Sequence, residues 1–126
     1  MSKNGKVAIV TGAGQGIGEA TAKRLAADGA AVSVWDVNAE AAEAVAGAIR
    51  EAGGKAVACV VDVSNKEQVD AAVAKTVEEL GGLHIVVNNA GITRDKSAKK
   101  LSEAAWDLVL AVNLKGTFLV CQAAIN

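Results

Sequence analysis

The fold is decided by residues 7–18, which read VAIVTGAGQGIG. The continuous apolar run at the start of this stretch, Val7 to Val10, predicts a strand that is buried on both faces. A glycine-rich turn follows, and the pattern of residues 16–28 then predicts a helix that Gly29 ends at its C′ position. A buried strand, a tight turn and a helix in this order are typical of parallel α/β sheets.

Strands and helices continue to alternate along the rest of the chain. Apolar runs and helical periodicity predict further elements in turn, over residues 31–35, 39–52, 55–61, 65–80 and 83–87. A loop is predicted over residues 88–101, before a final helix that Ser102 caps. With right-handed crossovers, this order gives a Rossmann-type parallel α/β sheet of strand order 3-2-1-4 with helices on both faces. Residues 1–126 are expected to form a single domain.

The predicted helix at residues 65–80 carries two local signals. Ser64 is expected to be its N-cap, and Glu67 is expected to complete a capping box. Its apolar stripe is expected to consist of Val69, Val73, Val77 and Leu80. This stripe predicts the face on which the helix packs against the sheet.

The composition favours one soluble domain. The chain has 126 residues, of which 52% are hydrophobic, and its net charge is -1 at pH 7. Neither this charge nor any basic run favours nucleic acid or a membrane surface as a partner, and no apolar run approaches the ~20 residues that a membrane span needs. Cys59 and Cys121 lie in apolar surroundings, which is typical of buried free thiols in a reducing compartment. We therefore expect a cytoplasmic protein.

The single histidine and the two tryptophans are not predicted to take part in catalysis or ligand binding. His84, the single histidine, begins the last predicted strand, far from the carboxyl end of the sheet, so it is given no role. No metal site is expected, because the chain offers no cluster of ligands. Trp35 and Trp106 are interpreted as packing residues.

Four glycines after the first strand predict a binding site for a pyrophosphate. They allow the backbone to approach an anion, and the N-terminus of the next helix offers unpaired N–H donors. We predict that the cofactor is bound by the residues of this turn, namely Gly12, Gly14, Gln15, Gly16, Ile17 and Gly18. A P-loop would need Gly-Lys where Ile17-Gly18 stands, which disfavours hydrolysis of nucleoside triphosphates. A tight turn without a ligand is the alternative interpretation.

An acidic residue follows the second predicted strand. Asp36 lies 18 residues beyond Gly18, near the ~20 that separate a Rossmann glycine loop from the acid that binds the adenosine ribose. Its carboxylate can accept hydrogen bonds from both ribose hydroxyls, and its charge repels a 2′-phosphate. Neither Gln15 nor Val37 could neutralise such a phosphate. Asp36 therefore favours NAD over NADP, and a helix-capping role ahead of Asn38 is the alternative.

Two single positions carry weaker signals. Asp62 is predicted to form a hydrogen bond with the amino group of the adenine while the backbone of Val63 lies against the ring, although an Asp before Ser64 is equally typical of a turn. Asn113 is a polar residue inside an apolar helical pattern, where it needs a partner. It is a candidate for holding a catalytic water, and a core asparagine bonded within the protein is the alternative.

The sequence NNAG at residues 88–91 ends the fourth predicted strand. The strand order reverses between the first and fourth strands, and ligands bind such sheets at that point. The two asparagines are expected to tie the loops together, and Asn89, Ala90 and Gly91 are predicted to contact the cofactor. A plain Asn-Gly turn is the alternative.

Together these residues resemble the N-terminal half of the short-chain dehydrogenase/reductase family. The resemblance covers essentially the whole chain and rests on TGAGQGIG at 11–18, Asp36, Asp62-Val63, NNAG at 88–91 and NLKG at 113–116. Residues 88–95, NNAGITRD, are similar to 3-oxoacyl-[acyl-carrier-protein] reductases, which usually take NADPH, whereas Asp36 favours NAD. The resemblance implies an NAD(P)-dependent oxidoreductase that passes hydride between nicotinamide and a small-molecule carbonyl or alcohol.

The resemblance also implies what this chain lacks. In the family a tyrosine transfers the proton with help from a lysine and a serine, and an asparagine completes the set through a water. Asn113 matches that asparagine and is the one predicted catalytic residue. The chain has no tyrosine, so we expect it to bind the dinucleotide but to be inactive alone. Family members continue with further strands beside the fourth, so a truncated or naturally short chain with an open edge strand is expected to be a homo-oligomer or to be incompletely stable alone.

Two other functions remain open at this point. The GAGQG sequence at residues 12–16 also fits the loop of an S-adenosylmethionine-dependent methyltransferase, whose ribose Asp36 could bind, although Thr11 and residues 88–91 disfavour it. A non-catalytic nucleotide-binding or assembly module would bind its ligand without turnover.

Overall fold

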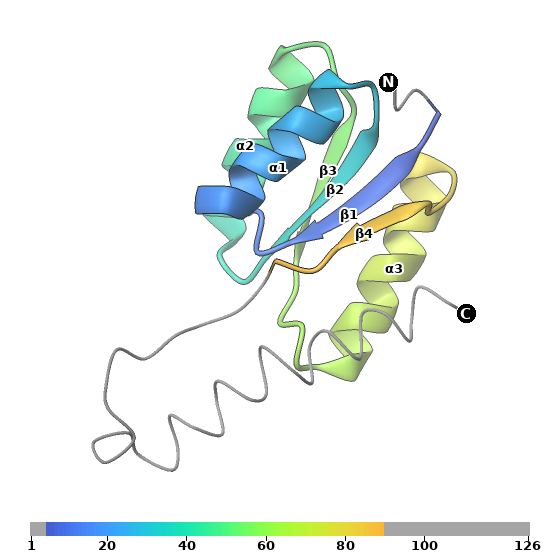
Figure 1. The fold of residues 1–126 in the computed structure, drawn as a ribbon. Helices are drawn as coiled ribbons and strands as arrows, with labels where there is room; N and C mark the ends of the chain where they lie inside the picture. Colours follow the sequence, from blue (N-terminus) through green and yellow to red (C-terminus); the bar gives the residue numbers. More distant parts are fainter. Residues whose placement is uncertain (1–4, 90–126) are drawn as a thin grey trace.

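A computed structural model of the protein describes residues 5–89 (Figure 1). In chain order its elements are β1 (Val7–Thr11), α1 (Gly16–Ala27), β2 (Ala31–Asp36), α2 (Ala39–Glu51), β3 (Ala56–Val60), α3 (Lys66–Leu80) and β4 (Ile85–Val87). The strands of this part form one parallel sheet in the order β3-β2-β1-β4. The predicted α/β class and strand order are confirmed, and the predicted bounds differ from the observed ones by one or two residues.

The helices cover both faces of the sheet, as predicted. Helices α1 and α2 lie on one face and α3 lies on the other (Figure 1). Side chains alternate along β2, so Val32 and Val34 pack with Val45 of α2, whereas Trp35 packs with Val69 of α3. Full burial of one such valine stabilises the fold by about 1.5–3 kcal/mol relative to its exposed state. The sheet thus lies between two apolar layers.

The core on the α3 side contains a small polar cluster. The hydroxyl of Ser33, which is fully buried, accepts a hydrogen bond of 2.9 Å from the indole Nε1 of Trp35 and lies 2.8 Å from the hydroxyl of Thr76. The Sγ atom of Cys59 is 3.7 Å from the same hydroxyl. Trp35 is therefore a packing residue and Cys59 a buried free thiol, both as predicted. The cluster leaves none of its polar atoms without a partner, so its burial costs little.

The start of α3 differs from the predicted capping box. Its N-cap is Asn65, whose side chain accepts a hydrogen bond of 3.1 Å from the backbone N–H of Gln68. The hydroxyl of Ser64 instead donates to Oδ1 of Asp62 over 2.6 Å. The prediction of Ser64 as the cap was wrong because the turn that Asp62 closes uses the Ser64 hydroxyl and moves the start of the helix one residue on.

The packed face of α3 also differs in part from the predicted stripe. Val69, Ala72 and Thr76 are buried, whereas Val77 is 44% exposed. Val77 follows Val69 by eight residues, which corresponds to two full turns of an α-helix and about 80° more. Val77 therefore lies outside the helix face that Val69 occupies. The face instead continues through Thr76, which the polar cluster accommodates.

Strand β4 begins two residues later than predicted, and His84 lies just before it, bonded to the start of β1. The Nδ1 atom of His84 accepts a hydrogen bond of 2.9 Å from the backbone N–H of Val7, and the backbone N–H of His84 donates to the carbonyl of Val7. The imidazole thus occupies the place of a backbone acceptor at the amino end of the sheet. His84 is a structural residue, which its sequence pattern did not indicate.

Candidate functional site

The parallel strands bring their carboxyl ends to one edge of the sheet. Thr11 pairs with Trp35 and Val10 with Val87, so the loops after β1, β2 and β4 leave the sheet side by side (Figure 1). The order reverses between β1 and β4, which is the position where ligands bind open α/β sheets. The predicted site residues within the described part therefore gather at this edge.

The loop between β1 and α1 is a tight turn held on β2. Gly12 and Gly16 have φ angles of +62° and +61°, a backbone conformation that other residues adopt at a cost. The backbone N–H of Ala13 donates a hydrogen bond of 2.9 Å to the carbonyl of Trp35. These features fix the course of the loop, so the direction of its N–H groups is set before any ligand binds.

The N-terminus of α1 carries no side-chain cap. Gln15 is the N-cap residue, with an extended backbone and no hydrogen bond from its side chain to the helix. The side chain of Ile17 in the first turn is 78% exposed. The first backbone N–H groups of α1 consequently have no side-chain cap, and they lie at the positive end of the helix dipole. Such an end can bind an anion.

Gly18 allows α1 to pack closely on the loop that precedes it. A Cβ atom at position 18 would collide with the carbonyl oxygen of Gly12 and lie 2.6 Å from Nδ2 of Asn89. The absence of a side chain at Gly18 therefore lets α1 pack against Gly12 and Asn89. The glycine pattern of the sequence did not distinguish this reason from close approach to a ligand.

Asp36 ends β2 beside the glycine loop. Its Oδ2 atom accepts a hydrogen bond of 2.9 Å from the backbone N–H of Gly14, and its Oδ1 atom accepts one of 3.0 Å from the backbone N–H of Asn38. Two backbone donors thus fix the orientation of the carboxylate. Each carboxylate oxygen has two lone pairs, so Asp36 can still accept hydrogen bonds from two hydroxyl groups of a ligand.

Asn89 and Thr11 join the loop after β4 to the loop after β1. The hydroxyl of Thr11 accepts a hydrogen bond of 2.9 Å from the backbone N–H of Asn89, and Nδ2 of Asn89 donates to the carbonyl of Gly12 over 3.3 Å. This is the tie between loops that the paired asparagines predict. Thr11 was missed as a site residue, although a polar side chain at the end of a buried strand could have indicated it.

Asp62 and Val63 adopt the conformation of the turn that was the alternative at these positions. Oδ1 of Asp62 accepts hydrogen bonds from both the backbone N–H and the hydroxyl of Ser64. The side chain of Val63 is 5% exposed and packs in the core beside α3. Oδ2 of Asp62 accepts no hydrogen bond from residues 5–89, so the acid keeps one oxygen for a ligand.

Several predicted residues lie outside the described part of the chain. They are the predicted cofactor-binding residues Ala90 and Gly91, the predicted catalytic residue Asn113, the predicted cap Ser102, Trp106 and Cys121. The predictions made for them remain predictions.

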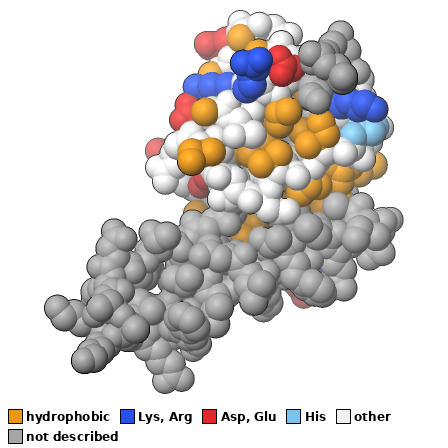
Figure 2. Space-filling model, viewed as in Figure 1, with side chains coloured by type: hydrophobic (Ala, Val, Ile, Leu, Met, Phe, Trp, Pro, Cys, Tyr) orange, Lys and Arg blue, Asp and Glu red, His pale blue; other side chains and the backbone are white. Residues whose placement is uncertain are grey.

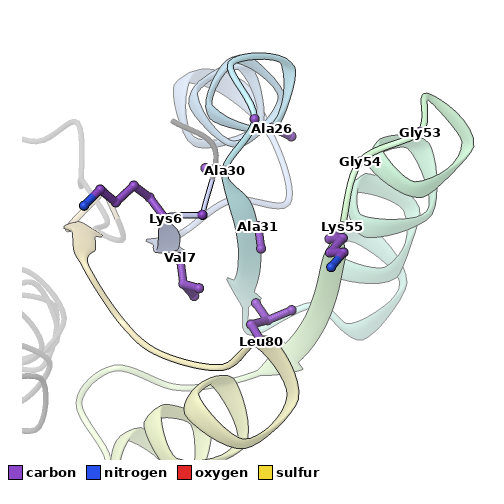
Figure 3. Close-up of a pocket in the computed structure, with 11 residues that line it drawn as sticks. Lys6, Val7, Ala26, Ala30, Ala31, Gly53, Gly54, Lys55 and Leu80 are labelled. Atoms are coloured by element: carbon purple, nitrogen blue, oxygen red, sulfur yellow. The ribbon is translucent and has the colours of Figure 1, made fainter. Parts of the chain in front are cut away.

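A cavity of about 390 Å³ lies at the opposite edge of the sheet (Figure 3). Its walls include Lys6 and Val7 at the start of β1, Ala31 at the start of β2 and Lys55 before β3, with Leu80 of α3 beside them. None of the predicted site residues that fall within residues 5–89 borders it. This cavity is therefore separate from the carboxyl edge, where the loops and the end of α1 converge.

Charged side chains of both signs are interspersed on the face that Figure 2 shows, with hydrophobic side chains between them. Two of the surface ion pairs, Lys23 with Glu19 and Lys66 with Asp70, are each 2.6 Å long. A surface of mixed sign gives no extended positive field on this face. Across residues 5–89, no three His, Cys, Asp or Glu side chains are grouped as metal ligands. Each helix of that same part is too short or too polar to cross a bilayer.

The chain is similar in sequence to a described protein family and to several known proteins. The family model described as short chain dehydrogenase matches residues 6–126. A short-chain reductase of Streptomyces niveus is 50% identical over 120 residues, which cover 95% of this chain and 45% of that protein. A 3-oxoacyl-[acyl-carrier-protein] reductase of Chlamydia trachomatis is 42% identical over 122 residues, 96% of this chain and 49% of that protein.

A solved structure extends the comparison to three dimensions. A 7α-hydroxysteroid dehydrogenase in complex with NADH and 7-oxo glycochenodeoxycholic acid superposes with a TM-score of 0.92 at 36% identity, over 98% of this chain and 48% of that one. The chain spans about half the length of the curated relatives it matches. With a family model that matches nearly all of its residues and relatives of this similarity, the chain belongs to the short-chain dehydrogenase family.

Proposed function

We propose that the protein is an NAD-dependent oxidoreductase and that this chain provides its dinucleotide-binding part. The observation that carries the proposal is the fixed carboxylate of Asp36 beside the uncapped N-terminus of α1, at the edge of the sheet where the strand order reverses. A negatively charged acceptor and a set of N–H donors at one edge match the two ends of an adenosine diphosphate. Membership of a family of dehydrogenases and reductases supports the same reading.

The described residues fit the group that the family implies. The backbone N–H groups at the start of α1 would bind the pyrophosphate, and the turn formed by Gly12 and Gly16 would hold it without side chains in the way. Asp36 would accept hydrogen bonds from the ribose, and the free oxygen of Asp62 would accept one from the adenine amino group. The bound nicotinamide would supply the hydride chemistry, and these residues would orient it.

The cofactor is proposed to be NAD rather than NADP. A 2′-phosphate would place a second negative group against the Asp36 carboxylate, whose two backbone partners hold it in position. Gln15 and Val37 beside it offer no positive charge. The solved relative with NADH is consistent with this choice.

The residues that complete the reaction are proposed from the family resemblance. Asn89, Ala90 and Gly91 would line the cofactor, and Asn113 would hold a water of the proton pathway. This sequence contains no tyrosine, so another part of the polypeptide would provide the proton donor, and residues 1–126 alone would bind the dinucleotide without turnover. The substrate would be a small-molecule carbonyl or alcohol. Because residues 88–95 resemble 3-oxoacyl-[acyl-carrier-protein] reductases, a 3-oxoacyl thioester is the first candidate. The whole enzyme is proposed to be a cytoplasmic homo-oligomer.

Two assays test this function on the full-length protein. The first compares NADH with S-adenosylmethionine in binding titrations, and we expect saturable enhancement of NADH fluorescence and no heat from S-adenosylmethionine. The second follows absorbance at 340 nm with 3-oxoacyl thioesters, ketosteroids and small diketones, and we expect oxidation of NADH with at least one class. Binding of S-adenosylmethionine alone would overturn the proposal, and binding of NADH without turnover on any carbonyl would reduce it to a non-catalytic module.

A further inference from the structure

Gly14 differs from the other three glycines of its loop. Gly12 and Gly16 have positive φ angles, and Gly18 is packed against the Gly12 carbonyl. The φ angle of Gly14 is not positive, so this angle gives no reason for a glycine at the position. The reason for a glycine at position 14 must therefore be the space around it.

That space is taken by the Asp36 side chain. A Cβ atom at position 14 would lie 2.7 Å from Oδ2 and 2.8 Å from Cγ of Asp36, and 2.8 Å from Cβ of Ala41 in the first turn of α2. Gly14 at the same time donates its backbone N–H to that Oδ2. The carboxylate can occupy its observed position only while residue 14 has no side chain, because the clash and the hydrogen bond involve the same oxygen.

We propose that Gly14 is a specificity-determining residue, which selects NAD over NADP by holding the Asp36 carboxylate in place rather than by making room for the pyrophosphate. The inference rests on the proposed function and adds to it. A side chain at position 14 would displace the flexible end of Asp36 from the loop. The displaced carboxylate would then bind the ribose hydroxyls less well and repel a 2′-phosphate less strongly.

The test is a set of variants of the full-length protein, titrated with NADH and with NADPH by calorimetry. Gly14→Ala keeps the backbone N–H and adds only the Cβ. We expect its NADH affinity to fall about tenfold or more, as the loss of a hydrogen bond to a charged group does. NADPH affinity should fall less or rise, so that the ratio of the two affinities drops. Gly47→Ala is the matched control, because Gly47 lies in α2 with open space around it, and its ratio should equal that of the parent.

A double-mutant cycle separates this account from a general effect on the loop. In an Asp36→Asn background, Gly14→Ala should leave the ratio of NADH to NADPH affinity unchanged, since the charge on which it acts is gone. Equal loss of affinity for both dinucleotides in the Gly14→Ala variant would overturn the inference and assign Gly14 to the pyrophosphate. If the variant is unfolded by its contact with Ala41, the Gly14→Ala/Ala41→Gly double variant removes that contact and repeats the test. A parent protein that binds neither dinucleotide would instead refute the proposed function.

Discussion

The side-chain amide of Asn89 lies 3.3 Å from the carbonyl oxygen of Gly12, and its backbone N–H lies 2.9 Å from the hydroxyl of Thr11. These bonds join two loops that are more than seventy residues apart in the sequence. They fix the loop after β4 against the glycine turn at the point where the strand order reverses. The geometry of the proposed cofactor site therefore depends on the hydrogen bonds that Asn89 forms with Thr11 and Gly12.

We expect Asn89→Ala to lower both stability and dinucleotide affinity. The substitution leaves the partly buried Gly12 carbonyl without this donor, which should cost about 1–2 kcal/mol in the free energy of unfolding. It also releases the glycine turn, so affinity for NADH should fall. Chemical denaturation and fluorescence titration of the full-length protein measure the two effects.

Asn65→Ala is the matched control for that variant. It removes the N-cap of α3, which should cost about 1 kcal/mol, but Asn65 lies outside the glycine turn and the loop after β4. Its NADH affinity should match that of the parent. If both variants lose affinity in proportion to their loss of stability, the tie between Asn89 and Gly12 has no specific part in binding.

His84 should be replaceable only by a residue that keeps an acceptor. His84→Ala removes the partner of the Val7 N–H at the amino end of the sheet and should lower the free energy of unfolding by about 1–2 kcal/mol. His84→Asn offers an amide oxygen near the same place and should recover part of the loss. Thermal or chemical unfolding measures the stability of the parent and of the two variants. Equal stability of the Ala and Asn variants would contradict the role of Nδ1 as an acceptor. Neither variant should change NADH affinity, because His84 lies at the far edge of the sheet.

The buried thiol of Cys59 should make the protein less stable in alkali. Burial raises the pKa of Cys59 above its ordinary value of 9.0, although the hydrogen bond with Ser33 and the charge of Lys75 offset part of this rise. Because the folded protein holds the thiol proton more tightly than the unfolded chain, the resulting stability is complete below about pH 9 and is lost as the pH rises through the folded-state pKa. Unfolding curves from pH 7 to pH 10 should therefore fall less steeply for Cys59→Ala than for the parent.

The raised pKa of Cys59 can also be tested by the rate at which its thiol is alkylated. Peptide-resolved labelling with iodoacetamide at pH 8 should modify Cys59 slowly in the folded protein and rapidly after denaturation, since the thiolate is the reactive form. Identical alkaline slopes for the parent and the variant, or fast labelling of Cys59 in the folded state, would contradict the raised pKa.

The sheet could be predicted from the sequence because its signals are local and agree with one another. Val7 to Val10 is an apolar run before a glycine turn, and the same alternation repeats through β4. Topology then follows from the handedness of the crossovers. The errors arose where a side chain had two possible partners. Ser64 satisfies both the sequence rule for a cap and the turn closed by Asp62, and only the packed structure selects between them.

The positions of the candidate site residues could be predicted from the sequence more fully than their contacts. The positions of Asp36 and Asn89 at the carboxyl edge follow from the strand pattern. The tie from Asn89 to Gly12, the acceptor role of His84 and the clash at Gly14 each join distant parts of the chain. No spacing rule carries this information. The four glycines look equivalent in the sequence, but the structure gives three different reasons for them. Gly12 and Gly16 have positive φ angles, Gly14 leaves space for the Asp36 carboxylate, and Gly18 packs against the Gly12 carbonyl.

The most direct measurement of the central claim is the affinity of the full-length protein for NADH, by isothermal titration calorimetry, before and after Asp36→Ala. We predict one saturable site per chain in the parent. In the variant, we predict that NADH affinity falls about tenfold or more, while NADPH affinity falls less or rises. Absence of binding to any adenine dinucleotide by the folded parent, or an unchanged NADH affinity in the variant, would contradict the account.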